Sequence, residues 1–411
     1  MVTKAWPETD AGGTLGDGLP ASATDRPASV AEVQDSIRAA VAADLAVYPQ
    51  GGGTALDYGG IPARPGVAVR MDRLDHVVDY PVADMTITVE AGITLGAVRD
   101  LVGRHGQRLA IEAAHPDRAT LGGIFSTAST GPRRFGWGRP RDQVIGVAFV
   151  DARGDLIRGG GRVVKNVAGY DLPKLLTGSL GTLGVITELT LKVNPRPEAS
   201  ALVSVDYDSL AEVAATLDRL NLSGTRPIAL ELITNPPELR RRWALKIGFE
   251  GNRAAVNWQV DRLISELYRS NSATDREVEA ESEWSTMIED EVHAAGLLSF
   301  AASFTPSQAL VFLDRVGLDR WSVRVHAGNG VVRGTARAVK DEEAWATEVD
   351  RLRGEAINLG GSLILTRCPT EWKARFQVWG PPRPDWAIAE RVKRALDPGH
   401  ILNPGRFVGT I

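Results

Sequence analysis

The sequence contains a single cysteine, Cys368, among its 411 residues. A disulfide within the chain, a cysteine-based zinc site and an iron–sulfur cluster held by this chain alone are therefore excluded. Excess charge is also small, since 47 basic and 51 acidic residues give a net charge of −4. Without a positive surplus to neutralise a phosphate backbone, nucleic acid is not an expected partner.

Long apolar runs are missing as well. No stretch reaches the length of about 18 uninterrupted apolar residues that a membrane span needs. The first residues also lack the apolar run of a secretory signal. We therefore expect a cytoplasmic protein with no direct membrane span, and attachment to a membrane complex through partners stays open. A hydrophobic content of 43% and a charged content of 24% are those of a soluble globular chain.

The pattern along the chain predicts several regions. Residues 1–25 show no periodicity and read as a mobile leader without a function. After them, Ser29 is a candidate N-cap, Glu32 completes a capping box, and an amphipathic helix leads into the apolar strand LAVYP. Strands and helices then follow in an α+β pattern, and we expect a first domain over residues 26–198, closed by prolines 195 and 197.

The pattern of predicted strands and helices changes in the second half of the chain. Strands and helices alternate with returning strands, which predicts an antiparallel sheet covered on one side by helices. This region, 199–390, is expected to be a separate domain. The last segment, 391–411, is a turn-rich ending. The predicted fold class is α+β.

Three glycine-rich loops carry the strongest chemical signal. The first, YPQGGGTALDYGG, begins at Tyr48 directly after an apolar strand. Glycines let backbone N–H groups converge on an anion, or lie flat against a ring. A nucleotide-triphosphate P-loop is excluded because Thr54 is followed by Ala55 and no lysine is present. A diphosphate inside a dinucleotide remains possible.

The second loop, HPDRATLGGIFSTASTGPRR, supplies hydroxyls and two adjacent glycines between His115 and Arg134. The third, KNVAGYDLPKLLTGSLGTLGVITE, spaces Gly178, Gly181 and Gly184 three apart before a strand. A single loop of this kind is usually a structural turn. Three such loops, polar and without fixed positive charge, suit an extended ligand held by backbone amides and hydroxyls.

The ordered motifs VYPQGGGT, ATLGGIFSTASTG, GYDLPKLLTGSLGTLGVITELTLKV and LDPGHILNPGRF resemble the signatures of the vanillyl-alcohol-oxidase (PCMH) type of FAD-binding flavoproteins. The resemblance covers residues 26 to 198 and the last 15 or so. Within that family, GPRR at 131–134 and GGRVVKNVAGYDLPKLLTGSLGTLG resemble most the FAD-binding E subunit of bacterial glycolate oxidase.

This resemblance implies that residues 26–198 form an FAD-binding domain whose two α+β subdomains grip the cofactor. Residues 199–390 would then form a cap or substrate domain over the flavin, and the segment 391–411 would return to the FAD-binding domain.

The resemblance also implies which residues contact the cofactor. Those of the first loop would wrap the diphosphate: Pro49, Gln50, Gly51, Gly52, Gly53, Thr54, Ala55 and Leu56. Those of the second would line the ribityl and flavin side: Thr120, Gly122, Gly123, Ser126, Thr127, Ser129 and Thr130. Gly184, Val185 and Ile186 would meet the adenine end, and Asn403 would approach the flavin ring unless it only initiates a turn before Pro404.

Attachment of the FAD is expected to be non-covalent. Relatives that tether the cofactor place His or Cys in these loops, whereas the first loop here has Ala55 and the second has no cysteine. His115 lies beside the second loop, where a surface histidine before Pro116 is the simpler interpretation.

In the cap, RVHAGNGVVRG resembles an altered form of the motif with which 2-hydroxyacid dehydrogenases bind a divalent metal through two histidines. His326 is present, but Arg333 stands at the second position, and a guanidinium is no metal ligand. We expect no metal. Two interpretations stay open: Arg324 and Arg333 bind a carboxylate while His326 removes the hydroxyl proton, or this cluster is structural and the chain only carries FAD.

The resemblance therefore implies an FAD-dependent oxidoreductase. Our first hypothesis is a subunit of a glycolate oxidase-like complex that oxidises a small 2-hydroxyacid. Its partners would be a catalytic flavoprotein subunit and an iron–sulfur subunit. The alternatives are a free-standing FAD dehydrogenase of another hydroxyacid or alcohol, and a non-catalytic structural subunit with an empty flavin fold.

Overall fold

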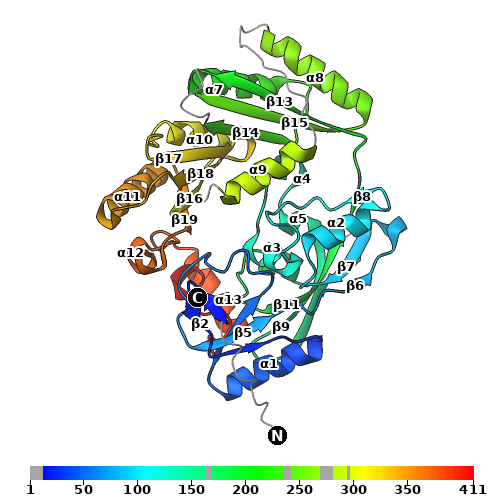
Figure 1. Ribbon diagram of the computed structural model, residues 1–411, viewed down its shortest axis with the longest axis vertical. Coiled ribbons are helices and arrows are strands. Elements are labelled where there is room, and N and C mark those ends of the chain that lie inside the picture. Colours follow the sequence, from blue (N-terminus) through cyan, green and yellow to red (C-terminus); the bar gives the residue numbers. More distant parts are fainter. Residues whose placement is uncertain (1–12, 163–168, 235–241, 269–280, 294–296) are drawn as a thin grey trace. The chain divides into compact units, whose positions relative to one another are not determined.

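The structure is a computed structural model that describes residues 13–162, 169–234, 242–268, 281–293 and 297–411. It divides into two compact units (Figure 1). Unit 1 consists of residues up to Thr130, Arg139–Arg196 and Pro381–Ile411. Unit 2 consists of Gly131–Gly138 and Pro197–Gly380. Each unit has its own core, and mixed helices and antiparallel sheets confirm the α+β class.

In the residues that the structure describes, unit 1 contains four sheets. The three-stranded sheet is parallel, in the order β3 (Ala23–Asp25), β5 (Gly66–Arg70), β4 (Ala46–Gln50). The five-stranded sheet is antiparallel, in the order β10 (Leu156–Gly160), β9 (Val144–Val150), β11 (Val185–Lys192), β7 (Thr86–Glu90), β6 (Val77–Asp79). Two short pairs complete the set: β1 (Thr14–Gly16) with β2 (Leu19–Pro20), and β8 (Gln107–Arg108) with β12 (Asn194–Pro195).

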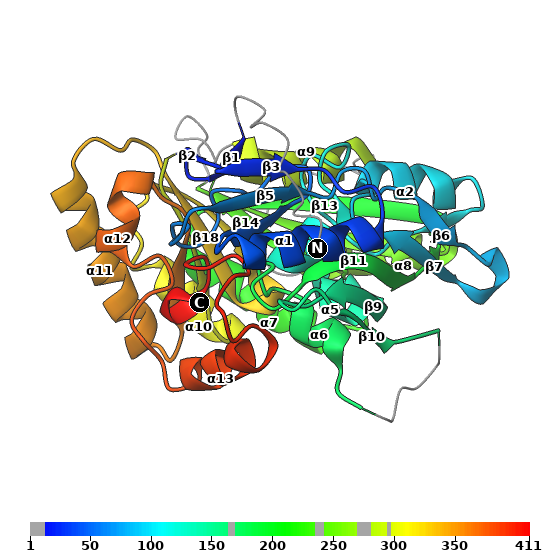
Figure 2. The same cartoon turned by 90° about the horizontal axis from the view of Figure 1, so that it is seen from below.

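The helices of unit 1 are α1 (Val30–Ala42), α2 (Leu95–Gly103), α3 (Leu121–Thr127), α5 (Pro140–Gln143), α6 (Leu172–Leu176) and α13 (Trp386–Leu396), with 3-10 turns at Val82–Asp84 and Val408–Thr410. The predicted first helix is confirmed as α1, which packs beside β4 and β5 (Figure 2). Ser29 caps it by accepting from the N–H of Glu32 at 3.2 Å. The Glu32 carboxylate reaches back to the N–H of Ala28 instead of that of Ser29.

The predicted mobile leader is wrong for residues 14–25, because these form β1, β2 and β3. β3 adds to the parallel sheet beside β5, and Leu15 packs in a small core with Tyr48. The expectation failed because strands of two or three residues leave no periodicity to detect. Residues 1–12 lie outside the described residues.

Unit 2 is built on one antiparallel sheet of seven strands. Their order is β13 (Ala199–Tyr207), β15 (Trp243–Gly251), β14 (Ala229–Thr234), β17 (Trp321–His326), β18 (Val331–Ala336), β16 (Ser299–Ser303), β19 (Ser362–Arg367). Its helices are α4 (Arg134–Trp137), α7 (Leu210–Leu222), α8 (Arg253–Tyr268), α9 (Glu281–His293), α10 (Pro306–Leu313), α11 (Glu342–Asn358) and α12 (Lys373–Phe376), with 3-10 turns at Ala327–Asn329 and Thr370–Trp372.

The two faces of this sheet differ. On one face, alternate residues such as Val203, Val323 and Val325 join the largest core of the chain, together with residues of α7, α8, α10 and α11. On the other face, Trp284 and Met287 of α9 pack against Leu202 and Ala229. Helices therefore contact both faces, whereas the sequence led us to expect them on one side only.

Two segments lie in a different unit from the region to which the sequence assigned them. Residues 131–138 belong to unit 2, because Arg133 and Trp137 both bind Glu250 on β15. Residues 381–390 belong to unit 1, because α13 begins at Trp386 and continues through Lys393 into the core of that unit. Within the described ranges, no helix combines the length and apolarity that crossing a membrane requires.

Candidate functional site

The glycine triplet of the first loop leaves no room for side chains at two of its positions, because other parts of the chain pack directly against its backbone. A Cβ on Gly51 would lie 2.0 Å from Oγ1 of Thr120, and one on Gly52 would lie 1.6 Å from the carbonyl oxygen of Arg118. Backbone at such a distance cannot be moved cheaply. Gly53 adopts the left-handed region, with φ of 72°. The triplet is therefore required by the close packing of the first loop on the second.

The third loop and the C-terminal segment pack at the same position, where the first and second loops contact each other. The N–H of Leu180 donates to the carbonyl of Ser126 at 2.9 Å, which joins the third loop to the second. Gly181 has a φ of 70°, and a Cβ there would lie 2.8 Å from Cγ of Pro49 in the first loop. The side-chain amide of Asn403 donates to the carbonyl of Leu180 at 2.5 Å. Four segments far apart in the sequence thus converge within unit 1.

The hydroxyls of the second loop are partly used locally. Thr120 is buried and caps α3 by accepting from the N–H of Gly123 at 3.3 Å. The Thr127 hydroxyl donates to the carbonyl of Gly123 at 2.9 Å and hydrogen-bonds to Ser129. Half-buried positions in the same loop are those of Gly122, Ser126 and Thr130.

The residues predicted for the adenine end lie in a different setting. Gly184 faces Phe149, because a Cβ on Gly184 would lie 2.3 Å from that ring. Val185 and Ile186 have buried side chains and pair with β9. Any contact of these three residues with a cofactor would therefore have to use the backbone.

A cavity of about 480 Å³ lies against the first loop. The loop contributes Gln50, Gly51, Gly52, Gly53 and Leu56 to its wall. The N-terminal strands contribute Gly13, Thr14 and Thr24, and the remaining wall is Ala68, Arg70 and Arg118. The predicted contacts of the second and third loops and Asn403 do not line this cavity, although their backbones adjoin the same loop.

Arg406 holds the far end of the first loop and was missed by the sequence reasoning. Its buried guanidinium donates to the carbonyl of Gly60 at 2.7 Å and to that of Leu56. It also pairs with the buried Asp17 at 2.5 Å. Because this ion pair joins positions 389 apart, no local pattern could have revealed it.

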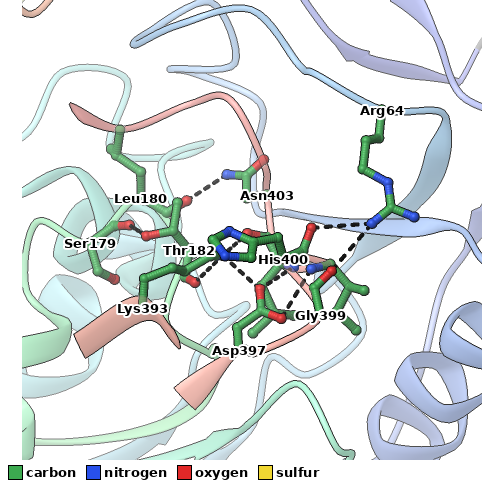
Figure 3. A network of polar contacts seen from close by, with 11 residues as sticks. Arg64, Ser179, Leu180, Thr182, Lys393, Asp397, Gly399, His400 and Asn403 are labelled. Atoms are coloured by element: carbon green, nitrogen blue, oxygen red, sulfur yellow. Dashed lines mark hydrogen bonds and ion pairs between the residues drawn. The ribbon is translucent and has the colours of Figure 1, made fainter. Parts of the chain in front are cut away.

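A second buried ion pair fixes the C-terminal segment (Figure 3). Nζ of Lys393 on α13 lies 2.6 Å from Oδ2 of Asp397, the residue that follows this helix, and both side chains are fully buried. The Lys393 ammonium also donates to the carbonyls of Thr182 and Leu402, at 2.8 and 2.7 Å. Asp397 accepts from the N–H groups of Ile401 and Leu402. The pair therefore ties the third loop and the chain before Asn403 to one helix.

Burial lowers the pKa of Lys393, an effect that the charge of Asp397 and its hydrogen bond oppose. The ammonium nevertheless has three oxygen acceptors within hydrogen-bonding distance. Such a network is costly to leave incomplete, which makes it a rigid support.

In unit 2, Arg324 and His326 lie on β17 and Arg333 lies on β18. Arg324 and His326 are two residues apart and so share one face of the sheet, and Arg333 is the direct cross-strand partner of Arg324. The structure therefore brings the three predicted residues together. Arg324 also donates to the carbonyl of Met287.

Glu231 on β14 is the residue of this cluster that the sequence did not reveal. It is paired with His326 across the sheet, and its Oε1 lies 2.6 Å from Nδ1 of the imidazole. Both side chains are only 1% exposed. A carboxylate on Nδ1 fixes the orientation of the ring and increases its basicity, which is the arrangement of a positioned general base. Among the described residues, no group of three or more His, Cys, Asp or Glu could hold a metal ion.

Comparison with known proteins places these features in context. Residues 21–160 match the family described as FAD binding domain, and residues 380–407 match that of FAD linked oxidases, C-terminal domain. The chain is 34% identical to D-2-hydroxyglutarate dehydrogenase of Xanthomonas citri pv. viticola, over 93% of this chain and 88% of that protein. Similarity to glycolate oxidase subunit GlcE of Escherichia coli K12 is 38% but covers only 39% of this chain and 48% of the relative.

The expected closeness to the E subunit therefore holds for part of the chain only. A solved structure of alkyldihydroxyacetonephosphate synthase has a TM-score of 0.70 and covers 94% of this chain and 77% of its own, at 18% identity. This likeness confirms the predicted fold. The part of the cavity wall that the first loop supplies, Gln50, Gly51, Gly52, Gly53 and Leu56, also fits a cofactor held by backbone groups.

Proposed function

This chain belongs to the family of FAD-linked oxidoreductases, and we propose that it is the FAD-binding subunit of a glycolate oxidase-like complex that oxidises a small 2-hydroxyacid. The observation that supports this proposal best is the convergence of the first, second and third loops with Asn403 in unit 1. The FAD is held without a covalent bond by backbone N–H groups and hydroxyls of these loops.

Each unit contributes a different part of the activity. Bound FAD supplies the capacity to accept a hydride equivalent and to release electrons. Unit 1 binds and orients the cofactor through the loops that Arg406 and Lys393 support. Unit 2 provides the carboxylate-binding charges of Arg324 and Arg333, and His326 as the base for the substrate hydroxyl.

The electrons are proposed to pass to an iron–sulfur partner. This chain has one cysteine and cannot hold such a cluster by itself. The partial similarity to GlcE supports a complex that also contains a catalytic flavoprotein subunit. The protein is proposed to be cytoplasmic, with any membrane attachment made through these partners.

One observation favours a second candidate, a free-standing FAD dehydrogenase. One relative that matches over 93% of this chain, at 34% identity, is a D-2-hydroxyglutarate dehydrogenase. The Glu231–His326 pair is also a complete acid–base unit within this chain, without any residue from a partner.

An absorption spectrum and an anaerobic titration test both candidates. We expect the purified chain to bind FAD, and acid precipitation to release all of the flavin into the supernatant. Glycolate, D-lactate and D-2-hydroxyglutarate are then added without oxygen. Bleaching of the flavin by the isolated chain would favour the free-standing dehydrogenase. Bleaching only after the partner subunits are added would support the complex, and a chain that ignores FAD would contradict both.

A further inference from the structure

Another cavity of unit 1 lies beside the C-terminal half of α1. Its volume, about 410 Å³, is within the range of sites for small molecules. Three segments form its wall: α1, the turn between β9 and β10, and the chain that follows α13. None of its wall residues belongs to the three glycine loops. These residues are Arg38, Val41, Ala152, Arg153, Asp397, Pro398, Gly399 and Ile401.

The inner surface of this cavity is mostly apolar. Ala152 and Ile401 are buried core residues, and Val41 is a large apolar residue of α1 that remains 48% exposed. The aliphatic stems of Arg38 and Arg153 add apolar surface beneath their charged groups. An apolar ligand body would remove this surface from water, which is favourable.

The turn between β9 and β10 is fixed against α1. The carbonyl of Gly154 accepts from Nε2 of Gln34 and from Nη2 of Arg38, both at 2.7 Å. The buried carboxylate of Asp151 accepts from the backbone N–H of Arg153 at 2.9 Å and from its Nε at 3.0 Å. This side of the cavity is therefore formed before any ligand arrives, which lowers the cost of binding.

The opposite side is fixed by the C-terminal segment. The carbonyl of Ile401 accepts from the N–H of Val47 at 2.7 Å, and the N–H of Ile401 donates to Oδ1 of Asp397 at 3.0 Å. The charge of Asp397 is balanced by Lys393 in the buried ion pair (Figure 3). Asp397 therefore adds no unbalanced negative charge to the wall.

The two arginines keep donors for a ligand. Nη1 of Arg38 lies 3.6 Å from Asp35, which is too long for a hydrogen bond. Arg153 uses Nε and Nη2 on Asp151, and its Nη1 has no acceptor in the part of the chain that the structure describes. Asp155 lies 4.0 Å from Arg38 and 3.9 Å from Arg153. Asp35 and Asp155 are outside the wall and exposed to solvent, which screens their charges.

We propose that this cavity binds a small amphipathic carboxylate, a molecule with an apolar body and one carboxylate group. The body lies against Val41, Ala152 and Ile401, and the carboxylate accepts hydrogen bonds from Nη1 of Arg38 and of Arg153. This site goes beyond the proposed function, because it uses neither the cofactor loops nor the hydroxyacid cluster of unit 2.

Isothermal titration calorimetry of the full-length protein tests this site with octanoate, octanol and acetate as probes. We expect octanoate to bind saturably at a single site. Octanol should bind about 10-fold more weakly, because it lacks the charge that the arginines recognise. Acetate should give no measurable binding, because it lacks the apolar body.

Arg38→Gln tests the recognition of the carboxylate. The turn should keep its position, because Gln34 still donates to the carbonyl of Gly154. We expect octanoate affinity to fall about 10-fold and octanol affinity to stay unchanged. Arg158→Gln is the matched control, because Arg158 is an exposed arginine of β10 that does not line the cavity. This control should bind both probes like the wild type.

Val41→Trp tests the place of the apolar body. The larger side chain fills part of the cavity, so the affinities for octanoate and octanol should both fall. Ile388→Trp is its control, because Ile388 is an exposed apolar residue of α13 outside the cavity wall. We expect this control to weaken neither probe.

Three results would overturn the proposal: no saturable binding of octanoate, equal affinities for octanoate and octanol, or binding that Arg38→Gln leaves unchanged. If Arg333→Gln abolishes octanoate binding and Arg38→Gln does not, the probe occupies the cluster of unit 2 and the proposal is wrong. The FAD content of the same samples is measured by absorbance. A protein that binds octanoate as expected but no FAD would refute the proposed function and leave this site standing.

Discussion

The two units use buried charge in opposite ways. In unit 1, the cations of Lys393 and Arg406 donate mainly to backbone carbonyls, and so hold turns that carry no side chains of their own. In unit 2, buried charges pair with other side chains, as Glu231 does with His326 and Arg133 with Glu250. Unit 1 is thus built to present backbone, and unit 2 to present side chains.

This difference suits the two tasks of the proposed function. A large cofactor common to a family can be held by backbone groups, which remain when side chains change. A substrate is distinguished by specific side chains, and these can vary without disturbing the cofactor. The comparison predicts that substitutions in unit 1 affect flavin binding, and that substitutions in unit 2 affect turnover.

Lys393→Met should produce the largest effect. It leaves the Asp397 carboxylate buried without its cation and removes donors from two carbonyls. Loss of one partner of a buried ion pair costs about 3–5 kcal/mol. We expect a lower urea midpoint for the unfolding of unit 1, followed by flavin release. Lys174→Met is the control, because the Lys174–Asp171 pair is exposed and should contribute under about 1 kcal/mol. Equal effects of the two changes would contradict a supporting role for Lys393.

Gly52→Ala tests whether the first loop depends on its close packing. The added Cβ would overlap the carbonyl of Arg118, so the loop must move away from the second loop. We expect FAD affinity to fall by about 100-fold, or about 2.7 kcal/mol. Gly103→Ala, at a helical glycine where a Cβ has open space, should leave affinity unchanged. Quenching of flavin fluorescence measures the FAD affinity of both variants. A Gly52→Ala affinity equal to that of the wild type would contradict the dependence of FAD binding on the packing of the first loop.

Glu231→Gln should separate the two units most clearly. The amide cannot balance a proton on His326, so the base loses strength while the shape of the side chain is kept. We expect substrate-dependent flavin reduction to slow by about 10-fold to 100-fold. FAD affinity should match the wild type, because Glu231 lies in unit 2. Stopped-flow absorbance measures the rate, in the isolated chain or the assembled complex. An unchanged rate would contradict a role of the Glu231–His326 pair in substrate oxidation.

Glu348→Gln should have the smallest effect, a change in the pH dependence of stability that is confined to acidic pH. Burial would raise the pKa of Glu348, but hydrogen bonds from Arg351 and Trp321 and the charges of Arg351 and Arg320 outweigh it, so the pKa lies below its ordinary value of 4.5. A depressed pKa stabilises the fold above pH 4.5, and this stability is lost as the pH falls further. We expect Glu348→Gln to reduce the pH dependence of unit 2 unfolding below that value, by about 1 kcal/mol. If the unfolding free energy of Glu348→Gln depends on pH below 4.5 as strongly as that of the wild type, the prediction is wrong.

The sequence revealed those features that depend on neighbouring residues. The helix after Ser29, the glycine loops and the turn-rich ending were recognisable because capping residues and glycines act locally. Arg324, His326 and Arg333 were grouped because their segment resembles a known motif, and the structure adds that Arg324 and Arg333 are cross-strand partners. Arg406, Lys393 and Glu231 were not recognisable, because each acquires its role from partners brought together by the whole fold. For them, burial and distance are the signal, and a single sequence contains neither.

Arg133 has a consequence for how the chain is made. Its guanidinium lies over the rings of Trp137 and Trp284 and pairs with Glu250, which is synthesised 117 positions later. Residues 131–138 must therefore leave the ribosome long before their binding place exists. A shortened polypeptide of residues 197–380 would contain the Glu250 carboxylate without its counter-ion and would be unsuited to production alone. Unit 2 is thus assembled from two parts of the chain that are far apart in the sequence, residues 131–138 and 197–380.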